Sequence, residues 1–448
     1  MNRQIDVPEK WRWFPEGRYG LFLHWGPYAA VGRGEQVLFR EHMDPAAYEQ
    51  AACRWNPKHF DAGAWASDAV RFGMKYACLT ARHHDGYCLW DSSLTDYTSF
   101  RQAPGRDFVR EYVEAFRKAG LRVGLYYSWL DWRIPSFFRG PKEDPEGWAV
   151  MREYIHGQVE ELLTRYGKID YLFFDGAWPR TREELDSPQL LKKIRTWQPE
   201  ILVNNRLGAS SLKVGEEDPG ADAELGDFGT PEREIRAERT RLWESCDVST
   251  QRLWGYGAGE YAKDPRQILD SLCQCAEMGG NLLMNVGPDV DGRFPEDVRA
   301  SLSAVGDWLK KNGEAIYGTM GGDVTEFLTH GRETFRENVL YLILKYWDGS
   351  PSIRVNDLLN RVKRASILST NQSLTFRREG DDVILSGLPA ARPDILFPVI
   401  RLELDGEPRT NEWGDWRNWQ GDPRRVAQWA AARGETVWVS KINGGKKT

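Results

Sequence analysis

Several short apolar segments of this 448-residue chain end in residues that can transfer protons or bind hydroxyl groups. Histidine, aspartate and tyrosine side chains serve enzymes as acids, bases, nucleophiles and hydrogen-bonding partners. A single buried histidine is most often structural, but several chemically active segment ends together indicate one functional site. These ends are His24-Trp25-Gly26, Arg82-His83-His84-Asp85-Gly86, Tyr126-Tyr127-Ser128 with Asp131-Trp132, and Asp175-Gly176.

Asp175 is the strongest candidate for a catalytic carboxylate. It follows the apolar run 171–174, and Gly176 after it leaves room for a substrate to approach closely. The alternative is an N-cap, in which the carboxylate of Asp175 accepts hydrogen bonds from the first turn of the next helix.

The histidines His24, His83 and His84 suggest a pocket for either a sugar or a metal ion. Successive residues of a strand point to opposite faces, so His83 and His84 could bind one ion only across a bulge. Neutral imidazoles that hydrogen-bond to hydroxyl groups suit a carbohydrate better. We therefore expect no metal and no cofactor.

The elements that position these residues alternate along the chain up to about residue 315. Short apolar segments are followed by amphipathic helices, a pattern typical of βα units around a parallel sheet. Catalytic groups of a βα barrel lie at the carboxyl ends of its strands, where the active segment ends would meet. The expected strands are 18–26, 75–86, 122–132, 170–176, 200–205 and 280–289, and the expected helices are 61–73, 107–119, 148–166, 184–198, 264–278 and 297–312.

The pattern changes near residue 320. Alternating apolar segments then continue without helices, which predicts an antiparallel β-sandwich. The expected fold class is α/β: a (β/α)8-type barrel over 1–320, followed by a small sandwich over 321–407. We assign no role to the extension 408–448. The acidic, glycine-rich stretch 207–239 is too long for a connector, and we expect an active-site loop there.

Composition narrows the class of protein. The net charge of −6 comes from 60 Lys and Arg and 66 Asp and Glu spread along the chain, which provides no basic face for nucleic acid. No apolar run approaches the roughly 18 residues that cross a bilayer. The N-terminal sequence lacks the apolar core of a secretory signal, so we expect a cytoplasmic location. The six cysteines form no C-x-x-C pair, and we interpret them as reduced.

A series of motifs occurs in order between residues 11 and 318. It comprises F-x-H-W-G-P-Y, R-H-H-D-G-Y-x-L-W-x-S, V-G-L-Y-Y-S-x-x-D-W, F-F-D-G, W-G-Y and G-G-N-L-L-M-N-V-G-P-x-x-D-G. In this combination and spacing the chain resembles the family 29 α-L-fucosidases. Composition and periodicity alone indicate only a barrel.

The resemblance implies a retaining, exo-acting hydrolase of α-L-fucosides whose nucleophile is the aspartate of F-D-G, Asp175. Fucose lacks a 6-hydroxyl group, so an apolar wall at its C6 methyl group leaves no buried polar group unpaired. The implied substrate-binding residues are Phe22 and Trp254 at the methyl group, His24, His83, His84 and Tyr126 at the hydroxyl groups, and Glu35 and Arg206. Arg206 follows the strand 200–205, and the alternative to a place in the active site is an arginine on the protein surface.

The chain departs from the family pattern at Gln36. Many members carry Glu-Trp where this sequence has Glu35-Gln36, so an amide replaces the ring that would pack on the sugar. The carboxylate of Glu35 would still bind a hydroxyl group. The change leaves open a different sugar specificity on the same catalytic machinery.

Two carboxylates resemble the acid/base of different branches of the family. Glu232 lies in D-F-G-T-P-E, and Glu244 lies in W-E-S-C, which precedes W-G-Y. A loop residue such as Glu232 could instead be solvated, and a strand residue such as Glu244 could orient its neighbours. We prefer Glu232.

The expected partner is a fucosylated oligosaccharide or glycoconjugate, with neither nucleic acid nor a membrane involved. One alternative is an exo-glycosidase of different sugar specificity. Another is a catalytically silent fucose-binding barrel, which the presence of Asp175 and both candidate acids disfavours. A homo-oligomer is compatible with the sequence, which does not indicate an oligomeric state.

Overall fold

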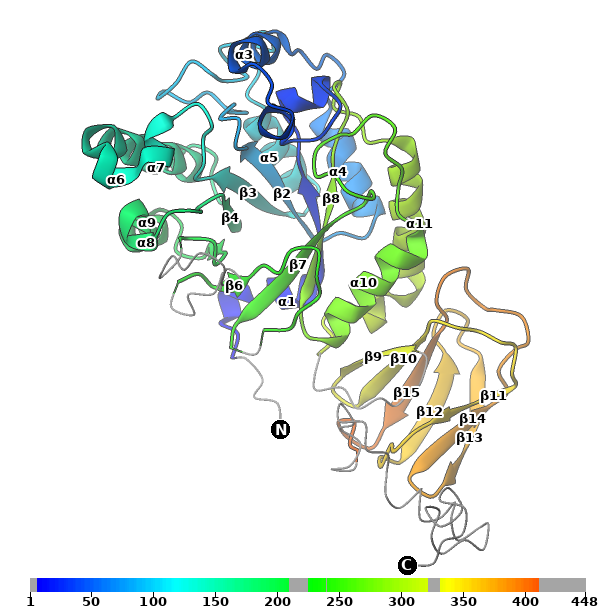
Figure 1. Ribbon diagram of the computed structural model, residues 1–448. Helices are drawn as coiled ribbons and strands as arrows, with labels where there is room; N and C mark the ends of the chain where they lie inside the picture. Colours follow the sequence, from blue (N-terminus) through cyan, green and yellow to red (C-terminus); the bar gives the residue numbers. More distant parts are fainter. Residues whose placement is uncertain (1–5, 209–224, 239, 321–330, 411–448) are drawn as a thin grey trace, which may run out of the picture. The chain divides into compact units, whose positions relative to one another are not determined.

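The computed structural model describes residues 6–208, 225–238, 240–320 and 331–410 (Figure 1). One compact unit ends at Thr319 and a second begins at Met320, and each is described by itself. Residues 411–448 of the expected extension, and residues 209–224 and 239 of the expected active-site loop, lie outside the described residues.

The first unit is a barrel of parallel strands in the order β5-β4-β3-β2-β1-β8-β7-β6. A parallel bridge between Asn204, which follows β5, and Phe228 of β6 closes the ring. The strands are β1 (Tyr19–Leu23), β2 (Tyr76–Arg82), β3 (Arg122–Ser128), β4 (Tyr171–Asp175), β5 (Leu202–Val203), β6 (Phe228–Gly229), β7 (Leu242–Val248) and β8 (Asn281–Val286).

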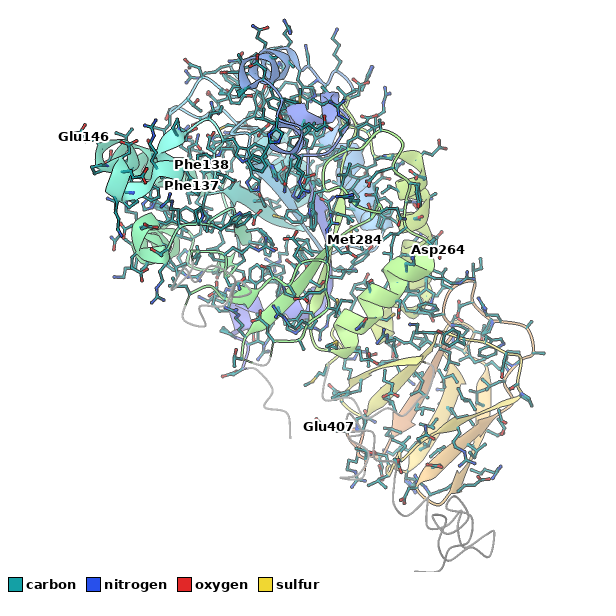
Figure 2. The ribbon with its side chains drawn as sticks, viewed as in Figure 1. Phe137, Phe138, Glu146, Asp264, Met284 and Glu407 are labelled. Atoms are coloured by element: carbon teal, nitrogen blue, oxygen red, sulfur yellow. The ribbon has the colours of Figure 1, made fainter. Side chains whose placement is uncertain are left out.

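Helices surround these strands (Figure 1). They pack through apolar stripes, and the stripe expected in 148–166 is buried in α7, as Met151, Ile155 and Val159 show. Asp264, labelled in Figure 2, precedes α10 as its N-cap and forms a capping box with Gln267. The helices are α1 (Trp13–Gly17), α2 (Val37–Arg40), α3 (Pro45–Arg54), α4 (Ala62–Arg71), α5 (Phe108–Lys118), α6 (Pro135–Glu143), α7 (Pro145–Thr164), α8 (Arg182–Leu185), α9 (Ser187–Trp197), α10 (Pro265–Glu277) and α11 (Glu296–Asn312), with 3-10 turns at Glu9–Trp11, Pro27–Ala30 and Gly313–Ala315.

Aromatic side chains fill the amino-terminal end of the barrel. Phe14 of α1 packs with ring centroids 5.6 Å from Tyr76, 6.1 Å from Tyr171 and 5.1 Å from Phe228. Tyr76 and Tyr171 are the first residues of β2 and β4, so this cluster occupies the end opposite the strand carboxyl termini. The amino-terminal end of the barrel is therefore filled by core side chains, and the opposite rim, formed by the carboxyl ends of the strands, is where a functional site is expected.

The second unit is an antiparallel sheet in the order β11-β14-β13-β12-β15-β10-β9. Leucine, valine and isoleucine side chains from six of its strands, β10 to β15, share one buried core, which is the arrangement of a sandwich. The strands are β9 (Gly331–Arg336), β10 (Val339–Leu344), β11 (Ser352–Val355), β12 (Val362–Ile367), β13 (Ser373–Glu379), β14 (Asp382–Ser386) and β15 (Val399–Leu404).

The expected fold class, a (β/α)8-type barrel followed by a C-terminal β-sandwich, is confirmed. The structure adds β6, β7 and β9 to the strands that the sequence predicted. Within the described residues no helix combines the length and apolar character needed to span a bilayer.

Candidate active site

Asp175 is the last residue of β4 and lies on the rim formed by the carboxyl ends of the strands. Gly176 after it adopts a φ of 71°. A Cβ atom at Gly176 would lie 2.9 Å from the Cε1 atom of His84. Glycine therefore allows the chain to turn away while His84 stays close to the carboxylate of Asp175.

The carboxylate of Asp175 is held by two hydrogen bonds and lies close to His84. Arg206 Nη1 donates to Oδ1 over 2.7 Å, and the hydroxyl group of Tyr126 donates to Oδ2 over 2.8 Å. His84 Nε2 lies 3.7 Å from Oδ2. Burial alone would raise the pKa of Asp175, but the charge of Arg206 and the hydrogen bonds from Arg206 and Tyr126 hold the pKa below its usual value. The carboxylate is therefore ionised at neutral pH.

Arg206 joins Asp175 to the preferred acid/base candidate. Its Nη2 donates to Glu232 Oε2 over 3.0 Å, and its Nε donates to the Thr230 hydroxyl over 2.9 Å. The guanidinium group also lies over the Phe173 ring, 5.1 Å from its centroid. Arg206 is thus not a surface arginine: one guanidinium group spans the gap between two carboxylates. Both carboxylates therefore lie within hydrogen-bonding distance of the same side chain.

Glu232 itself belongs to the described end of the stretch 207–239. Its side chain is 42% exposed. A parallel bridge between Glu232 and Cys246 attaches this segment to β7. The carboxylate therefore stands at the open side of the rim, where it can exchange a proton with water.

His24 and His84 are each fixed in one tautomer by a partner on a neighbouring strand. His24 Nδ1 lies 2.6 Å from the amide oxygen of Asn285, which can only accept. His84 Nδ1 lies 2.7 Å from the hydroxyl oxygen of Ser128, whose own proton is donated to the Leu130 carbonyl. Both Nδ1 atoms must donate, so in both neutral rings Nε2 is left as an acceptor.

His83 completes the group, with its ring stacked on Tyr126 at 5.6 Å and 12°. Its Nδ1 is a buried polar atom for which the described part of the chain provides no partner. Burial lowers the pKa of His24 to about 3 and that of His84 to about 4, and it lowers the pKa of His83 well below the usual value. The three imidazoles are therefore neutral at physiological pH.

The relation between His83 and His84 differs from the expected alternation. The pairing of β2 with β3 shifts register between Thr80 and Arg82, and both histidines follow the end of β2. Their ring centroids are only 4.2 Å apart, so both side chains lie on the same side of the rim. Even so, no three His, Cys, Asp or Glu side chains in the described ranges are grouped as metal ligands.

Trp254 and Phe22, the two residues expected to form an apolar wall, lie together with ring centroids 6.0 Å apart. Trp254 also lies 5.1 Å from the ring of His24. Glu35 is buried, and its Oε2 accepts hydrogen bonds from the backbone N–H groups of Trp254 over 3.2 Å and Gly255 over 2.8 Å. Glu35 therefore positions the Trp254 wall, a role that its motif did not reveal.

Glu244 lies apart from this group, although the sequence suggested it as the second acid/base candidate. It is fully buried in β7 and accepts hydrogen bonds from the hydroxyl groups of Tyr76 and Tyr171. Tyr171 begins β4 and Asp175 ends it, so the contact with the Tyr171 hydroxyl group places the carboxylate of Glu244 among side chains of the amino-terminal end of the barrel. Its place among the packed aromatic rings fits the alternative role of orienting its neighbours.

The stability of the barrel should depend on the protonation of Glu244. Burial raises the pKa of Glu244 from 4.5 to about 7. Because the folded-state pKa exceeds the unfolded one, the folded protein binds more protons between these values, and stability falls as the pH rises through them. We expect the free energy of unfolding of the wild type, relative to Glu244→Gln, to decrease by about 3 kcal/mol from pH 4.5 to pH 7. Urea denaturation of both proteins across this range measures the difference; a constant difference would show that Glu244 does not titrate there.

The neutral histidines give a second expectation. In Glu232→Ala, which lacks the proposed acid, kcat/KM for an activated aryl fucoside should stay constant from pH 7 down to about pH 5, because the three imidazoles remain unprotonated. A pH–rate profile tests this. An acid limb with a midpoint near 6.5 would show that an imidazole titrates at its ordinary pKa.

Two residues that support the site, Asn285 and Thr230, were not predicted, and Ser128 was named only as part of a segment end. Asn285 orients His24 and donates to the Trp254 carbonyl over 2.6 Å. Ser128 orients His84, and Thr230 holds Arg206. Asn285 and Ser128 lie within the motifs M-N-V-G-P and Y-Y-S at strand ends, so the signal was present; Thr230 precedes Glu232 by two residues.

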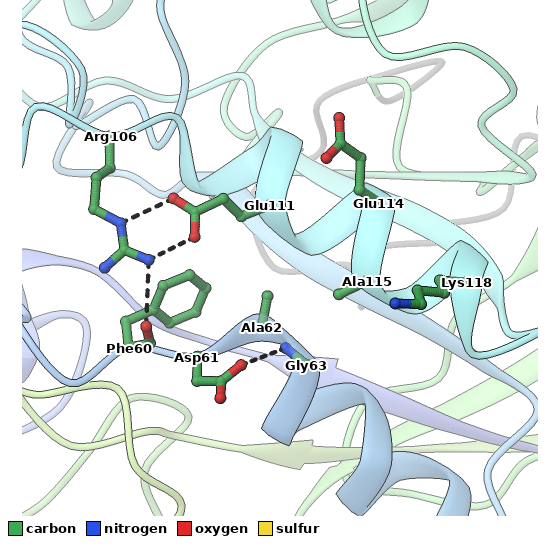
Figure 3. Close-up of a pocket in the computed structure, with 9 residues that line it drawn as sticks. All are labelled: Phe60, Asp61, Ala62, Gly63, Arg106, Glu111, Glu114, Ala115 and Lys118. Atoms are coloured by element: carbon green, nitrogen blue, oxygen red, sulfur yellow. Dashed lines mark hydrogen bonds and ion pairs between the residues drawn. The ribbon is translucent and has the colours of Figure 1, made fainter.

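A hollow on the outside of the barrel, between α4 and α5, is separate from the rim around Asp175 (Figure 3). Its lining includes Asp61, Glu114 and Lys118, and its arginine, Arg106, is paired with Glu111. None of the expected site residues lines it. The candidate site is therefore the rim around Asp175.

An ionised carboxylate at the rim of a βα barrel, joined through one arginine to a second, more exposed carboxylate, defines a class of protein: the glycoside hydrolases that work with a carboxylate pair. Comparison with known proteins gives the family. The family model described as alpha-L-fucosidase matches residues 2–314. The chain therefore belongs to the α-L-fucosidase family.

Curated relatives carry the same name. Tissue alpha-L-fucosidase of Rattus norvegicus is 28% identical over 417 residues, which are 87% of this chain and 87% of the relative. Tissue alpha-L-fucosidase of Bos taurus is 29% identical over 360 residues, 75% of each chain.

Solved structures agree in fold along nearly the whole chain. Alpha-L-fucosidase isoenzyme 1 from Paenibacillus thiaminolyticus is 36% identical with a TM-score of 0.80, covering 89% of this chain and 99% of the other. A GH29 alpha-L-fucosidase from Bacteroides thetaiotaomicron is 27% identical with a TM-score of 0.81, covering 90% and 96%. The same kind of enzyme from that organism was also trapped as a covalent intermediate with 2-fluoro-fucosyl fluoride, at 26% identity, a TM-score of 0.80 and coverage of 90% and 98%.

Proposed function

We propose that this chain hydrolyses terminal α-L-fucosides with retention of configuration, with Asp175 as nucleophile and Glu232 as acid/base. The observation that carries the proposal is the contact of one guanidinium group, Arg206, with both carboxylates, over 2.7 Å to Asp175 and 3.0 Å to Glu232. Two carboxyl groups that share one guanidinium group suit the double displacement of a retaining glycosidase, which needs a pair of neighbouring carboxyl groups.

In the first step the carboxylate of Asp175 attacks the anomeric carbon of the fucosyl group. The bond from that carbon to the glycosidic oxygen breaks, and Glu232 gives its proton to this oxygen, so the rest of the substrate leaves as an alcohol. Arg206 and Tyr126 hold the nucleophile in place, and the lowered pKa of Asp175 keeps it ionised. The product of this step is a fucosyl ester of Asp175.

In the second step a water molecule attacks the same carbon and the ester bond breaks. Glu232, now a carboxylate, takes a proton from the water, so both carboxyl groups return to their initial states. The 42% exposed side chain of Glu232 allows water to reach it. Two displacements at one carbon give net retention.

The remaining residues would hold the fucosyl group. His24 and His84 present Nε2 as an acceptor, so each would receive a hydrogen bond from a sugar hydroxyl group. Trp254 and Phe22 would face the C6 methyl group. An apolar wall rejects galactose, which carries an additional hydroxyl group there, by only about 10²-fold. The mechanism uses side chains alone, so prolonged chelation should leave the rate unchanged.

Hydrolysis of a panel of aryl glycosides tests the proposal. We expect the aryl α-L-fucoside to be cleaved about 10²-fold faster, in kcat/KM, than the corresponding galactoside. Preference for another sugar would favour the alternative that Gln36 raises, an exo-glycosidase of different specificity. Binding of fucose without turnover of any substrate would favour the silent barrel.

A further inference from the structure

Three aromatic side chains that are not buried in the core lie near His84 at the rim. They are Phe39 in α2, Trp132 after β3 and Trp178 after β4. Phe39 is 59% exposed and Trp178 is 54% exposed, whereas the wall residue Trp254 is only 9% exposed. Single exposed apolar residues are common, but rings from three separate segments around one site residue indicate a binding surface.

The rings are fixed relative to His84. The backbone N–H group of Trp132 donates to the His84 carbonyl over 2.9 Å, and the two rings meet at 5.5 Å and 62°. Phe39 stacks on Trp132 at 5.7 Å with an interplanar angle of 16°. Trp178 meets His84 from another side at 6.1 Å and 83°. The three rings thus form a continuous group through His84 and Trp132.

This aromatic group begins where the proposed fucosyl pocket ends. His84 Nε2 is 3.7 Å from Asp175 Oδ2, and Trp178 follows Asp175 by three residues. The pocket takes one terminal sugar, so the remainder of the substrate must cross the rim, where Trp178 and Glu232 are both exposed. Flat apolar rings are suited to the C–H faces of a sugar.

We infer that Phe39, Trp132 and Trp178 form an aromatic platform that binds a sugar of the leaving group, so that the substrates of this chain are fucosylated oligosaccharides rather than fucosides of small alcohols. The inference rests on the proposed function. Gln36 adds a hydrogen-bonding group one helical turn before Phe39: its Oε1 accepts from Arg40 over 2.8 Å, while its amide N–H groups have no protein partner within the described ranges. The stacked rings of Phe39 and Trp132 would then serve, just outside the pocket, in place of the tryptophan ring that many family members carry where this chain has Gln36.

The test compares two substrates in three variants. One substrate is α-L-fucosyl fluoride, whose leaving group is too small to reach the platform. The other is the best substrate of the wild type among fucosylated oligosaccharides with α1,2, α1,3, α1,4 and α1,6 linkages. The variants are Phe39→Ala, Trp178→Ala and a matched control, Phe138→Ala, which removes a phenylalanine that is 50% exposed on α6 (Figure 2).

For Phe39→Ala and Trp178→Ala we expect the ratio of kcat/KM on the oligosaccharide to kcat/KM on the fluoride to fall about tenfold, the effect of losing one stacked ring. For Phe138→Ala we expect no change in this ratio. Equal losses on both substrates, or no loss in either platform variant, would overturn the inference. So would a wild type that hydrolyses the fluoride but none of the oligosaccharides. If the wild type does not hydrolyse the fluoride, the proposed function itself fails.

Discussion

Replacement of Asp175 by glycine should reduce kcat for an aryl fucoside by roughly 10⁴-fold or more. The variant loses the proposed nucleophile. It keeps the backbone carbonyl of residue 175, which accepts a hydrogen bond from the Trp129 N–H group over 2.8 Å. Steady-state kinetics measures the loss. The urea midpoint of the variant should stay close to that of the wild type, which shows that the fold is intact.

Azide gives this variant a distinctive property. The space left by the carboxylate admits a small anion, which can attack the anomeric carbon from the side that Asp175 occupied. Azide should therefore restore part of the rate on a fucoside with a good leaving group and give a fucosyl azide of inverted configuration. An Asp175→Gly enzyme that keeps a rate near that of the wild type would contradict the assignment.

Replacement of Glu232 by alanine should have an effect that depends on the leaving group. A nitrophenolate departs as a stable anion, whereas a sugar alcohol must be protonated as the bond breaks. We expect kcat/KM to fall by about 10² to 10⁴-fold on an oligosaccharide and by less than about tenfold on an activated aryl fucoside. Azide should accelerate the second step and give a product of retained configuration.

Glu244→Gln is the matched control for this experiment, since it neutralises the other candidate carboxylate without changing its size. Glu244 is bonded to Tyr76 and Tyr171 at the opposite end of the barrel, so we expect its substitution to affect both substrates equally. If the leaving-group dependence appears in Glu244→Gln and not in Glu232→Ala, the two roles are exchanged.

The sequence predicted the barrel because most of its strands are continuous apolar runs. All seven residues of β2 are buried, and strands covered on both faces have this composition. β7 was not among the expected strands, because Glu244, Ser245 and Asp247 interrupt its apolar residues. β6 has only two residues, too few for a periodic pattern. Strands that carry buried polar groups inside a barrel are therefore the ones that hydrophobic periodicity misses.

The site was predicted from its motifs, but the contacts within it were not. Strand ends placed Asp175, His24 and His84 on one rim. The pairing of Arg206 with both Asp175 and Glu232 joins residues up to 57 positions apart, and no local pattern encodes it. His83 and His84 lie close together because both follow the last residue of β2, where the alternation of a regular strand no longer applies. The cytoplasmic location stays a prediction.

The most direct test of the account is the identity of the residue that becomes fucosylated. We expect 2-deoxy-2-fluoro-α-L-fucosyl fluoride to inactivate the enzyme and add one fluorofucosyl group per chain, because the fluorine slows the second step more than it slows departure of the fluoride. Peptide mapping by mass spectrometry should place this group on Asp175. A label on any other residue, or turnover of aryl fucosides by an enzyme that never acquires a label, would contradict the central claim that Asp175 is the nucleophile.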